Sequence, residues 1–552
     1  MRIEFNRGSG LRATGAAGVL VLAVVALAGA QSGDAGHETI RVDALKGHVF
    51  FLAAPEMGGR DSLSLEGRVA ANYIAGFFYR LGLKPVGDGQ TYFQQFPMSQ
   101  AFIDRARTRL RATVTTKPGG SIAHDYVLAS DFTLARQGGV DVDVSAPLVF
   151  AGYGIDAPEY GYSDYAGLDV AGKVVLVLSR EPQATDPQGR FKGTWDTYHA
   201  YPAWKPEVAR RYGAAGVLIV QGPPRRPPRA ASGPTNGQVR TDRPNHSLTS
   251  PFWDLPVFNI DARVANDLLS ASGKTIADLQ SAIDRGGSAQ SFQVPGVTVQ
   301  MRRAVTERRT VQTRNVVGVI EGSDPTLKDE YVLVTGHYDH VGQKPPLIFH
   351  GADDNATATA AVIAIAEAFK TRPPKRSVMF LVFEAEEDFL QGAFHYVDHP
   401  IVPLERTVAV LNMDMIGRDE ESATWNVKAA ESRDSVNLVG TLYSRDLRNT
   451  IERQNQKIGL RLDYKTDTDD REGWFSRSDH YPFAIKGVPM VLFNTGEHPD
   501  YHTANDTWDR INYLKMEKIV RLVYLAARDL ADATTRPRFV TGHMPAQKSP
   551  NP

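Results

Sequence analysis

Histidines and carboxylates gather in short motifs in the second half of the chain, and these are the residues best suited to chemistry. The motifs are Gly336-His337-Tyr338-Asp339-His340, Gly351-Ala352-Asp353-Asp354-Asn355, Glu384-Ala385-Glu386-Glu387, Asp414 and Tyr501-His502-Thr503. Each motif alone has an ordinary explanation, since Asp and Asn often cap helices and adjacent glutamates often form a solvated surface. Their combination is informative if the fold brings them together.

The elements around these motifs predict such a convergence. Continuous apolar runs, typical of strands buried on both faces, cover residues 331–335, 378–383, 407–413 and 489–494. Their alternation with helical patterns predicts an α/β fold, with a mixed, largely parallel sheet sandwiched by helices. Open α/β sheets bind ligands beyond the carboxyl ends of their strands, so the motifs should meet at one edge of the sheet.

Clustered carboxylates at a buried site repel one another and lose hydration, so a cationic partner is expected. Two divalent metals roughly 3.5–4 Å apart would neutralise them, lower the pKa of a water and polarise a carbonyl. A carboxylate that binds no metal must then take the proton of the water and pass it to the leaving amine. The motifs therefore predict a two-metal hydrolase site in which neighbouring glutamates divide this work.

Composition narrows the choice of metal ligands. The chain has 552 residues, no cysteine and a formal charge of −1. Disulfides, thiolate metal sites and a cysteine nucleophile are excluded, so any metal must be held by His, Asp and Glu. The balanced charge gives no support for nucleic-acid binding, and the length predicts more than one domain.

The N-terminus has the pattern of an export signal. Arg2, Arg7 and Arg12 precede an apolar run over residues 16–30, which ends in the small-residue sequence Ala28-Gly29-Ala30. We expect residues 1–30 to be a cleaved signal peptide and the mature protein to be periplasmic or extracellular. An uncleaved anchor is the alternative, but the run is short of the roughly 20 residues of a comfortable span. No later stretch spans a membrane, so no stable span should remain after cleavage.

The remaining chain divides into blocks of different character. Residues 37–140 include a helical pattern over 66–81, closed by Gly82. Residues 141–295 show short β runs separated by turns, and residues 302–533 carry the α/β pattern. We expect a discontinuous domain of 37–140 and 302–533, interrupted by a β-rich insert at 141–295. Residues 534–552 are expected to form a flexible tail.

With these motifs in view, the chain resembles the M28 family of di-zinc metallopeptidases. The similarity also covers Glu56-Met-Gly-Gly-Arg60, residues 315–325 and 412–417, and Ser478-Asp479-His480. The middle block resembles a protease-associated (PA) domain at residues 150–155, 165–176 and 213–219. The resemblance implies an aminopeptidase that acts on peptides with a free N-terminus, and the export signal described above implies that it is exported. It does not indicate the oligomeric state.

The resemblance also implies roles for individual residues. His337 and Asp414 would bind one Zn²⁺, Glu387 and His502 a second, and Asp354 would bridge the two. Co²⁺ or Mn²⁺ would also suit these ligands.

Three further residues would serve catalysis. Glu386 would be the general base, Asp339 would orient His337, and Tyr501 would stabilise the tetrahedral intermediate. Ser478-Asp479-His480 is expected to be structural or to support the metal ligands without binding metal. The insert is expected to cover part of the active-site cleft and to restrict access to short peptides.

Two alternatives remain open at this stage. A glutaminyl cyclase shares the fold but uses one zinc, and such relatives generally lack a ligand like His337 and carry Trp in place of Tyr501. A binding module without catalysis would have lost ligands or the base, whereas the complete set is present here.

Overall fold

The computed structural model describes residues 36–540 apart from gaps at 117–119, 136–137, 185, 187, 192–196, 203, 221–243, 250–253 and 469–472. The predicted signal peptide at 1–30 and the end of the expected tail, 541–552, lie outside the described residues. Within the described ranges, no helix combines the length and apolar character needed to cross a bilayer.

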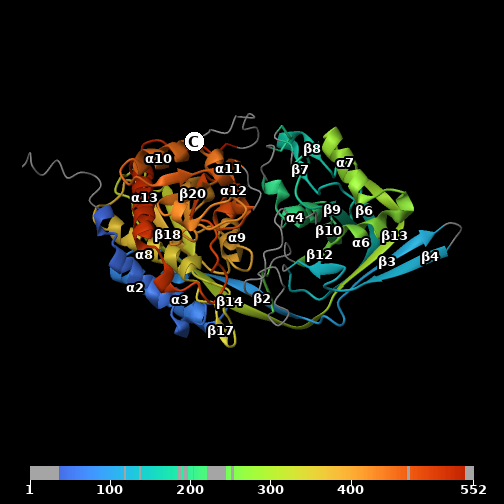
Figure 1. Cartoon of the computed structure of the whole chain (residues 1–552), viewed down its shortest axis with the longest axis horizontal. Helices are drawn as coiled ribbons and strands as arrows, with labels where there is room; N and C mark the ends of the chain where they lie inside the picture. The colour runs from blue at the N-terminus through green and yellow to red at the C-terminus, as the bar shows by residue number, and fades with distance from the viewer. Residues whose placement is uncertain are drawn as a thin grey trace, which may run out of the picture.

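A ten-stranded mixed sheet forms the larger of two units (Figure 1). Its four central strands are parallel: β18 (Ser377–Phe383), β15 (Tyr331–His337), β19 (Thr407–Met413) and β22 (Met490–Asn494). Beyond β18 the sheet continues through β14 (Val305–Ile320), β2 (Phe93–Ile103) and β11 (Asn245–Leu248), with β1 (Lys84–Pro85) also paired to β14. Beyond β22 lie β20 (Ser435–Val439) and β21 (Arg461–Asp463). The predicted fold class is confirmed.

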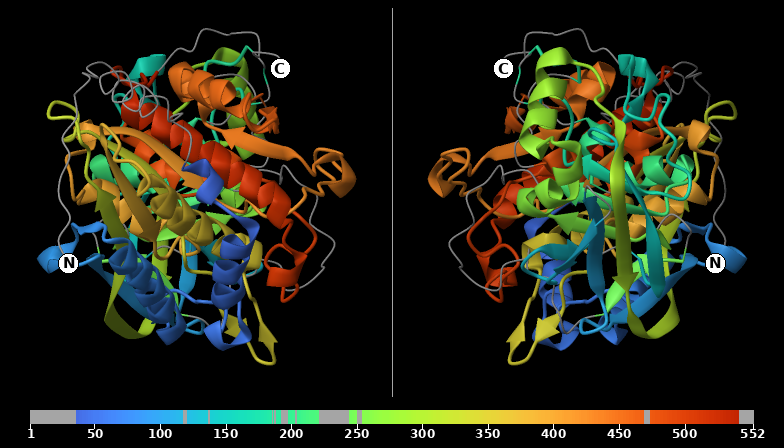
Figure 2. Two further views of the ribbon diagram at one scale, coloured as in Figure 1. Left: turned by 90° about the vertical axis from the view of Figure 1, so that its left-hand side faces the viewer. Right: turned by 90° about the vertical axis from the view of Figure 1, so that its right-hand side faces the viewer.

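Helices cover both faces of this sheet because its strands are apolar on both sides. Val332 and Val334 of β15 enter the core on one face, and Leu333 enters the core on the other. The first face is covered by α2 (Val42–Leu52), α3 (Leu65–Leu81), α8 (Ala358–Phe369) and α13 (Tyr513–Asp532), which the left view of Figure 2 faces. The second face carries α9 (Gln391–Asp398) and α12 (His480–Ile485). Helix α10 (Arg445–Asn455) packs on α13.

Helix α3 confirms the helical pattern expected over residues 66–81. Ser64 caps its first turn by accepting a hydrogen bond from the Gly67 N–H, and Gly82 ends it with φ 62°. A left-handed residue is the common end of a helix, and glycine adopts it without steric cost.

The second unit is an eight-stranded sheet with helices on both faces. Its order is β4 (Gly120–Tyr126), β3 (Arg109–Thr116), β13 (Phe292–Arg303), β6 (Val142–Phe150), β9 (Val174–Leu178), β10 (Gly216–Val220), β12 (Val257–Ile260) and β5 (Phe132–Leu134). Helices α6 (Ala262–Leu269) and α7 (Ile276–Gly286) pack on one face, and α4 (Trp204–Arg211) packs on the other. Two short hairpins lie outside both large sheets: β7 (Asp156–Ala157) pairs with β8 (Tyr162–Ser163), and β16 (Gln343–Lys344) pairs with β17 (Leu347–Ile348).

The division between the sheets differs from the blocks read from the sequence. Strands β3 to β5 precede residue 141 yet belong to the smaller sheet, and β11 lies within 141–295 yet pairs with β2 of the larger sheet. The chain passes from β2 to β3 through one short polar turn at 104–108, so no change of composition marks the crossing.

The start of the expected tail is attached to the larger unit. The ring of Phe539 stacks on Tyr443 with centroids 5.6 Å apart, and the Val540 N–H donates to the Tyr443 carbonyl over 2.8 Å. Arg536 donates to the carbonyl oxygen of Thr407 at the start of β19.

Candidate metal centre

The predicted site residues lie together at the carboxyl ends of the four parallel strands. His337 ends β15, Glu386 and Glu387 follow β18, Asp414 follows β19, and His502 lies in the loop after β22. Asp354 reaches the same place from the turn before α8. All these side chains are buried or nearly so.

The side chains form two groups that share one carboxylate. His337, Asp354 and Asp414 make up the first group, and His340, Asp354, Glu387 and His502 the second. Within each group the candidate ligand atoms all lie within 4.8 Å of one another. Asp354 faces both groups, because its Oδ1 lies 3.4 Å from His337 Nε2 and its Oδ2 lies 2.6 Å from His502 Nε2.

The first group leaves space for a cation. His337 Nε2 is buried and has no hydrogen-bond partner within the described part of the chain. The carboxylates of Asp354, Asp414 and Glu386 surround it at 3.4, 3.5 and 3.7 Å. An imidazole nitrogen facing carboxylates just beyond bonding distance is a donor set that suits a zinc ion.

Asp339 holds the loop of the two glutamates. Its carboxylate accepts hydrogen bonds from the N–H of Glu386 at 3.1 Å, from the N–H of Glu387 at 3.2 Å and from Ser62 Oγ at 3.0 Å. The distance from Asp339 Oδ1 to His337 Nδ1 is 3.7 Å, longer than a hydrogen bond, and Nδ1 lies closer to the Asp339 carbonyl oxygen, at 3.2 Å. Asp339 therefore contacts the loop of Glu386 and Glu387 more closely than it contacts His337, the histidine that it was expected to orient.

Burial and crowding perturb the acid–base behaviour of the site. Burial raises the pKa of Glu386 well above its ordinary value, and the charges of Asp414 and Glu387 raise it further against the opposing effect of His337. Burial alone would lower the pKa of His502, but the carboxylates of Glu387 and Asp354 outweigh it and raise the pKa to about 10. Strongly perturbed groups that cluster in one cleft are typical of functional sites.

The loops that present these side chains contain strained backbone. Ala385, Met415 and His502 have φ of 58°, 55° and 54°, the left-handed region that residues with a side chain rarely adopt. Gly351 is also left-handed, with φ 59°, and a Cβ there would lie 2.3 Å from the Asp354 carbonyl oxygen. The approach of the Asp354 turn to its neighbours therefore requires glycine at this position.

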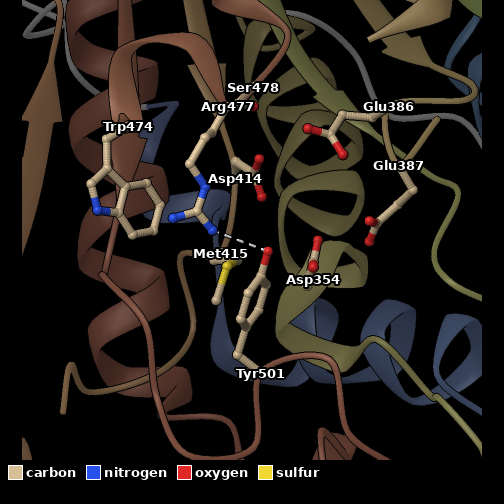
Figure 3. A pocket seen from close by; sticks show the side chains of 9 residues that line it. All are labelled: Asp354, Glu386, Glu387, Asp414, Met415, Trp474, Arg477, Ser478 and Tyr501. Carbon is tan, nitrogen blue, oxygen red and sulfur yellow. Dashed lines mark hydrogen bonds between the residues drawn. The ribbon is translucent and has the colours of Figure 1, made fainter. Parts of the chain in front are cut away.

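A pocket opens onto the site (Figure 3). Carboxylates form one part of its wall, and aromatic, sulfur-containing and cationic side chains form another. Its lining residues are Asp354, Glu386, Glu387, Asp414, Met415, Trp474, Arg477, Ser478 and Tyr501. In Figure 3 the Tyr501 hydroxyl points toward Arg477 and the carboxylates. Asp479, next to Ser478, is fully buried.

Several residues of the site have no role assigned from the sequence. His340 Nδ1 lies 2.9 Å from Glu387 Oε1, which places His340 in the second group. The Asp506 carboxylate accepts from the backbone N–H groups of Asp353 and Asp354. In the sequence, the second histidine of the 337–340 motif was the only indication of the contact between His340 and Glu387.

The Arg60 guanidinium is fully buried and connects separate segments of the chain. It donates to the carbonyl oxygens of Leu52, Tyr338, His350 and Gly351. These contacts tie the two ends of the 338–351 stretch to each other and to the end of α2. The motif 56–60 drew attention to this arginine without indicating its contacts.

Family models match both units of the chain. Residues 315–527 match peptidase family M28, and residues 144–268 match the PA domain. The first match includes all of the residues in both candidate ligand groups. The chain therefore contains a peptidase M28 domain and a PA domain.

Curated relatives and solved structures include named peptidases. Aminopeptidase YwaD of Bacillus subtilis is 26% identical over 280 residues, 48% of this chain and 57% of that protein. A glutamate carboxypeptidase 2 homolog of Caenorhabditis briggsae is 24% identical over 430 residues, 70% of this chain and 51% of that protein. The chain thus spans little more than half the length of these relatives. The structure of an aminopeptidase from Aneurinibacillus sp. strain AM-1 superposes with a TM-score of 0.49 at 18% identity, covering 93% of this chain and 98% of that one.

Proposed function

We propose that the protein is a zinc-dependent aminopeptidase that removes the N-terminal residue of peptides. The observation that carries this proposal is the pair of buried donor groups that share Asp354. His337 and Asp414 would complete one zinc site, and Glu387 and His502 the other. Zinc ions bound there supply a Lewis acid for the scissile carbonyl and lower the pKa of the attacking water.

Glu386 is the base in this proposal because it lines the pocket and belongs to neither donor group. Its carboxylate takes the proton of the attacking water and delivers it to the leaving amine. Asp339 fixes the base by accepting hydrogen bonds from the Glu386 and Glu387 N–H groups. The Tyr501 hydroxyl donates a hydrogen bond to the carbonyl oxygen as that oxygen gains negative charge.

The choice of a free N-terminus follows the B. subtilis relative, which is an aminopeptidase. Zinc would compensate the charges of Asp354, Glu387 and Asp414, which leaves Glu386 as the carboxylate of the wall that binds no metal.

We also propose that the mature protein is exported after cleavage of residues 1–30. The peptidase domain would comprise 37–140 and 302–533 and the insert 141–295, except that β3 to β5 join the sheet of the insert and β11 joins the peptidase sheet. The insert would lie over part of the cleft. The contact of Tyr201 in the insert with Tyr481 of α12, ring centroids 4.5 Å apart, supports this placement.

The test uses the chain without residues 1–30. It should hydrolyse aminoacyl-anilides, lose activity with a chelator and recover it with zinc. Glu386→Gln should keep its zinc and lose several orders of magnitude in kcat, because the shape is kept and the base is removed. Full activity of that variant would exclude Glu386 as the base.

Metal stoichiometry separates this proposal from a cyclase. We expect two zinc ions per chain and no cyclisation of N-terminal glutamine. One tightly bound zinc together with cyclisation would refute the peptidase assignment.

A further inference from the structure

Arg477 is a cationic side chain in a pocket wall that also contains four carboxylates. It follows the short helical turn at Trp474–Ser476 and precedes α12. Its guanidinium lies 4.4 Å from the centre of the Trp474 ring and 5.9 Å from that of Tyr501. The arginine is thus held between two aromatic rings that also line the pocket.

The guanidinium has two specific acceptors. Nη1 donates to Glu497 Oε1 over 3.0 Å, and Nη2 donates to the Tyr501 hydroxyl oxygen over 3.2 Å, the dashed line in Figure 3. Glu497 is only 3% exposed, so its charge compensates Arg477 inside the protein. The planar fork of arginine holds two acceptors in a fixed geometry that a lysine would not reproduce.

This contact determines where the Tyr501 proton points. A guanidinium only donates, so the hydroxyl oxygen accepts from Arg477, and its own proton must point elsewhere. The hydroxyl faces the pocket and the candidate metal ligands, where Asp354, Glu387 and Tyr501 share the wall. A hydroxyl that accepts from a cation is also polarised into a stronger donor.

We propose that Arg477, held by Glu497, positions the Tyr501 hydroxyl as a hydrogen-bond donor to the oxyanion that forms from the substrate carbonyl. The inference rests on the proposed peptidase function and deepens it. Arg477 is a positioning residue in this scheme, because it acts through Tyr501. A direct anion subsite at Arg477 is disfavoured, since Glu497 already compensates its charge.

The chain offers a matched control outside the site. Arg448 stacks on the Tyr464 ring at 3.7 Å, and Arg448 Nε and the Tyr464 hydroxyl both donate to Glu452, over 2.8 and 2.9 Å. Arg448→Met therefore removes a comparable part-buried contact without touching the pocket.

The experiment uses the mature, zinc-loaded chain and the variants Arg477→Met, Arg477→Lys, Tyr501→Phe and the Met/Phe double variant. Loss of an oxyanion donor typically costs about 10²–10³ in kcat. We expect Tyr501→Phe to lose about that much and Arg477→Met to lose about 10–100-fold, with little change in KM. The double variant should match Tyr501→Phe alone, because Arg477 acts only through the hydroxyl. Arg477→Lys should recover part of the loss.

Inhibitor binding separates positioning from a general structural role. Arg477→Met should weaken the binding of a tetrahedral aminophosphonate by the same factor by which it lowers kcat. Its affinity for the product amino acid and its zinc content should equal those of the wild type. The control Arg448→Met should match the wild type in all of these measurements. If the losses of the two single variants multiply in the double variant, the inference is overturned. A rise in KM confined to substrates with acidic side chains would also overturn it. A wild-type chain that holds zinc but hydrolyses no substrate would overturn the proposed function and the inference with it.

Discussion

Asp506 offers a direct test of how the proposed bridging carboxylate is held. This residue is fully buried, and its carboxylate accepts from the Asp353 N–H at 3.0 and 3.1 Å and from the Asp354 N–H at 3.2 Å. Its own carbonyl oxygen accepts from the Ala352 N–H over 3.1 Å. One residue thus binds three successive amides of the turn that presents Asp354.

Asp506→Asn changes one acceptor oxygen into a donor and leaves the volume nearly unchanged. With the amide oxygen in the Oδ2 position both N–H groups keep an acceptor, but the amide NH₂ then faces the Asp353 N–H, which Oδ1 accepts at 3.0 Å. With the amide flipped, the Asp354 N–H is left buried and unpaired, and either conflict costs about 1–3 kcal/mol. Each remaining bond also loses its charged acceptor, worth about 1 kcal/mol more. The total of about 2–4 kcal/mol overlaps with about 1.4–2.8 kcal/mol, the free energy equivalent to the roughly 10–100-fold loss of metal affinity that follows loss of a group holding a ligand.

Zinc competition against a chromophoric chelator measures this affinity, and urea unfolding of the metal-free protein measures the cost to folding. Asp509→Asn is the control, because Asp509 lies in the same loop and is exposed. Zinc affinity and unfolding both equal to the wild type would refute the idea that Asp506 holds the turn. A variant that unfolds more easily but binds zinc as tightly as the wild type would show that Asp506 stabilises the fold without contributing to metal affinity.

Three other expectations concern different parts of the molecule. His337→Ala should bind one zinc ion in place of two and lose anilide hydrolysis, and metal analysis of the purified variant checks this. Burial lowers the pKa of His48 to about 4, so the folded state binds its proton less readily than the unfolded chain and loses stability as the pH falls from 6.5 through 4. Between pH 7 and 4.5, His48→Gln should lose about 2–3 kcal/mol less unfolding free energy than the wild type, as measured by urea unfolding. The same pH dependence in variant and wild type would count against this role of His48. Tyr201→Ala should raise kcat/KM for long peptides relative to dipeptides, because Tyr201 brings the insert against α12; equal ratios in the two proteins would exclude a gating role for this contact.

Much of the site was predictable because buried parallel strands have a recognisable sequence pattern. The apolar runs that became β15, β18, β19 and β22 are hydrophobic on both faces, which leaves few other interpretations. Once these strands are taken as neighbours, the polar residues after each one must meet at one edge. The convergence of the candidate ligands therefore follows from local sequence and one rule of topology.

The contacts that fix those ligands could not be predicted in the same way. Arg60 donates to the carbonyl oxygen of His350, 290 positions along the chain, and Asp506 lies 152 positions from Asp354. Periodicity and capping rules describe neighbours in sequence and contain no information about such pairs. The membership of β3 to β5 in the smaller sheet escaped prediction for a related reason, since strand pairing depends on partners such as β13 that lie far away in the sequence.

Local rules fail most clearly where the proposed chemistry lies. Ala385 precedes the proposed base, Met415 follows Asp414 and His502 is itself a candidate ligand, yet all three adopt a left-handed backbone that costs about 1–2 kcal/mol each. Buried carboxylates around His337 add an electrostatic cost. The apolar strands that lead into these loops are fully buried and provide a rigid base that tolerates such costs. Strain and clustered carboxylates at the same strand ends are expected of loops shaped to hold cations, because metal binding offsets the electrostatic cost.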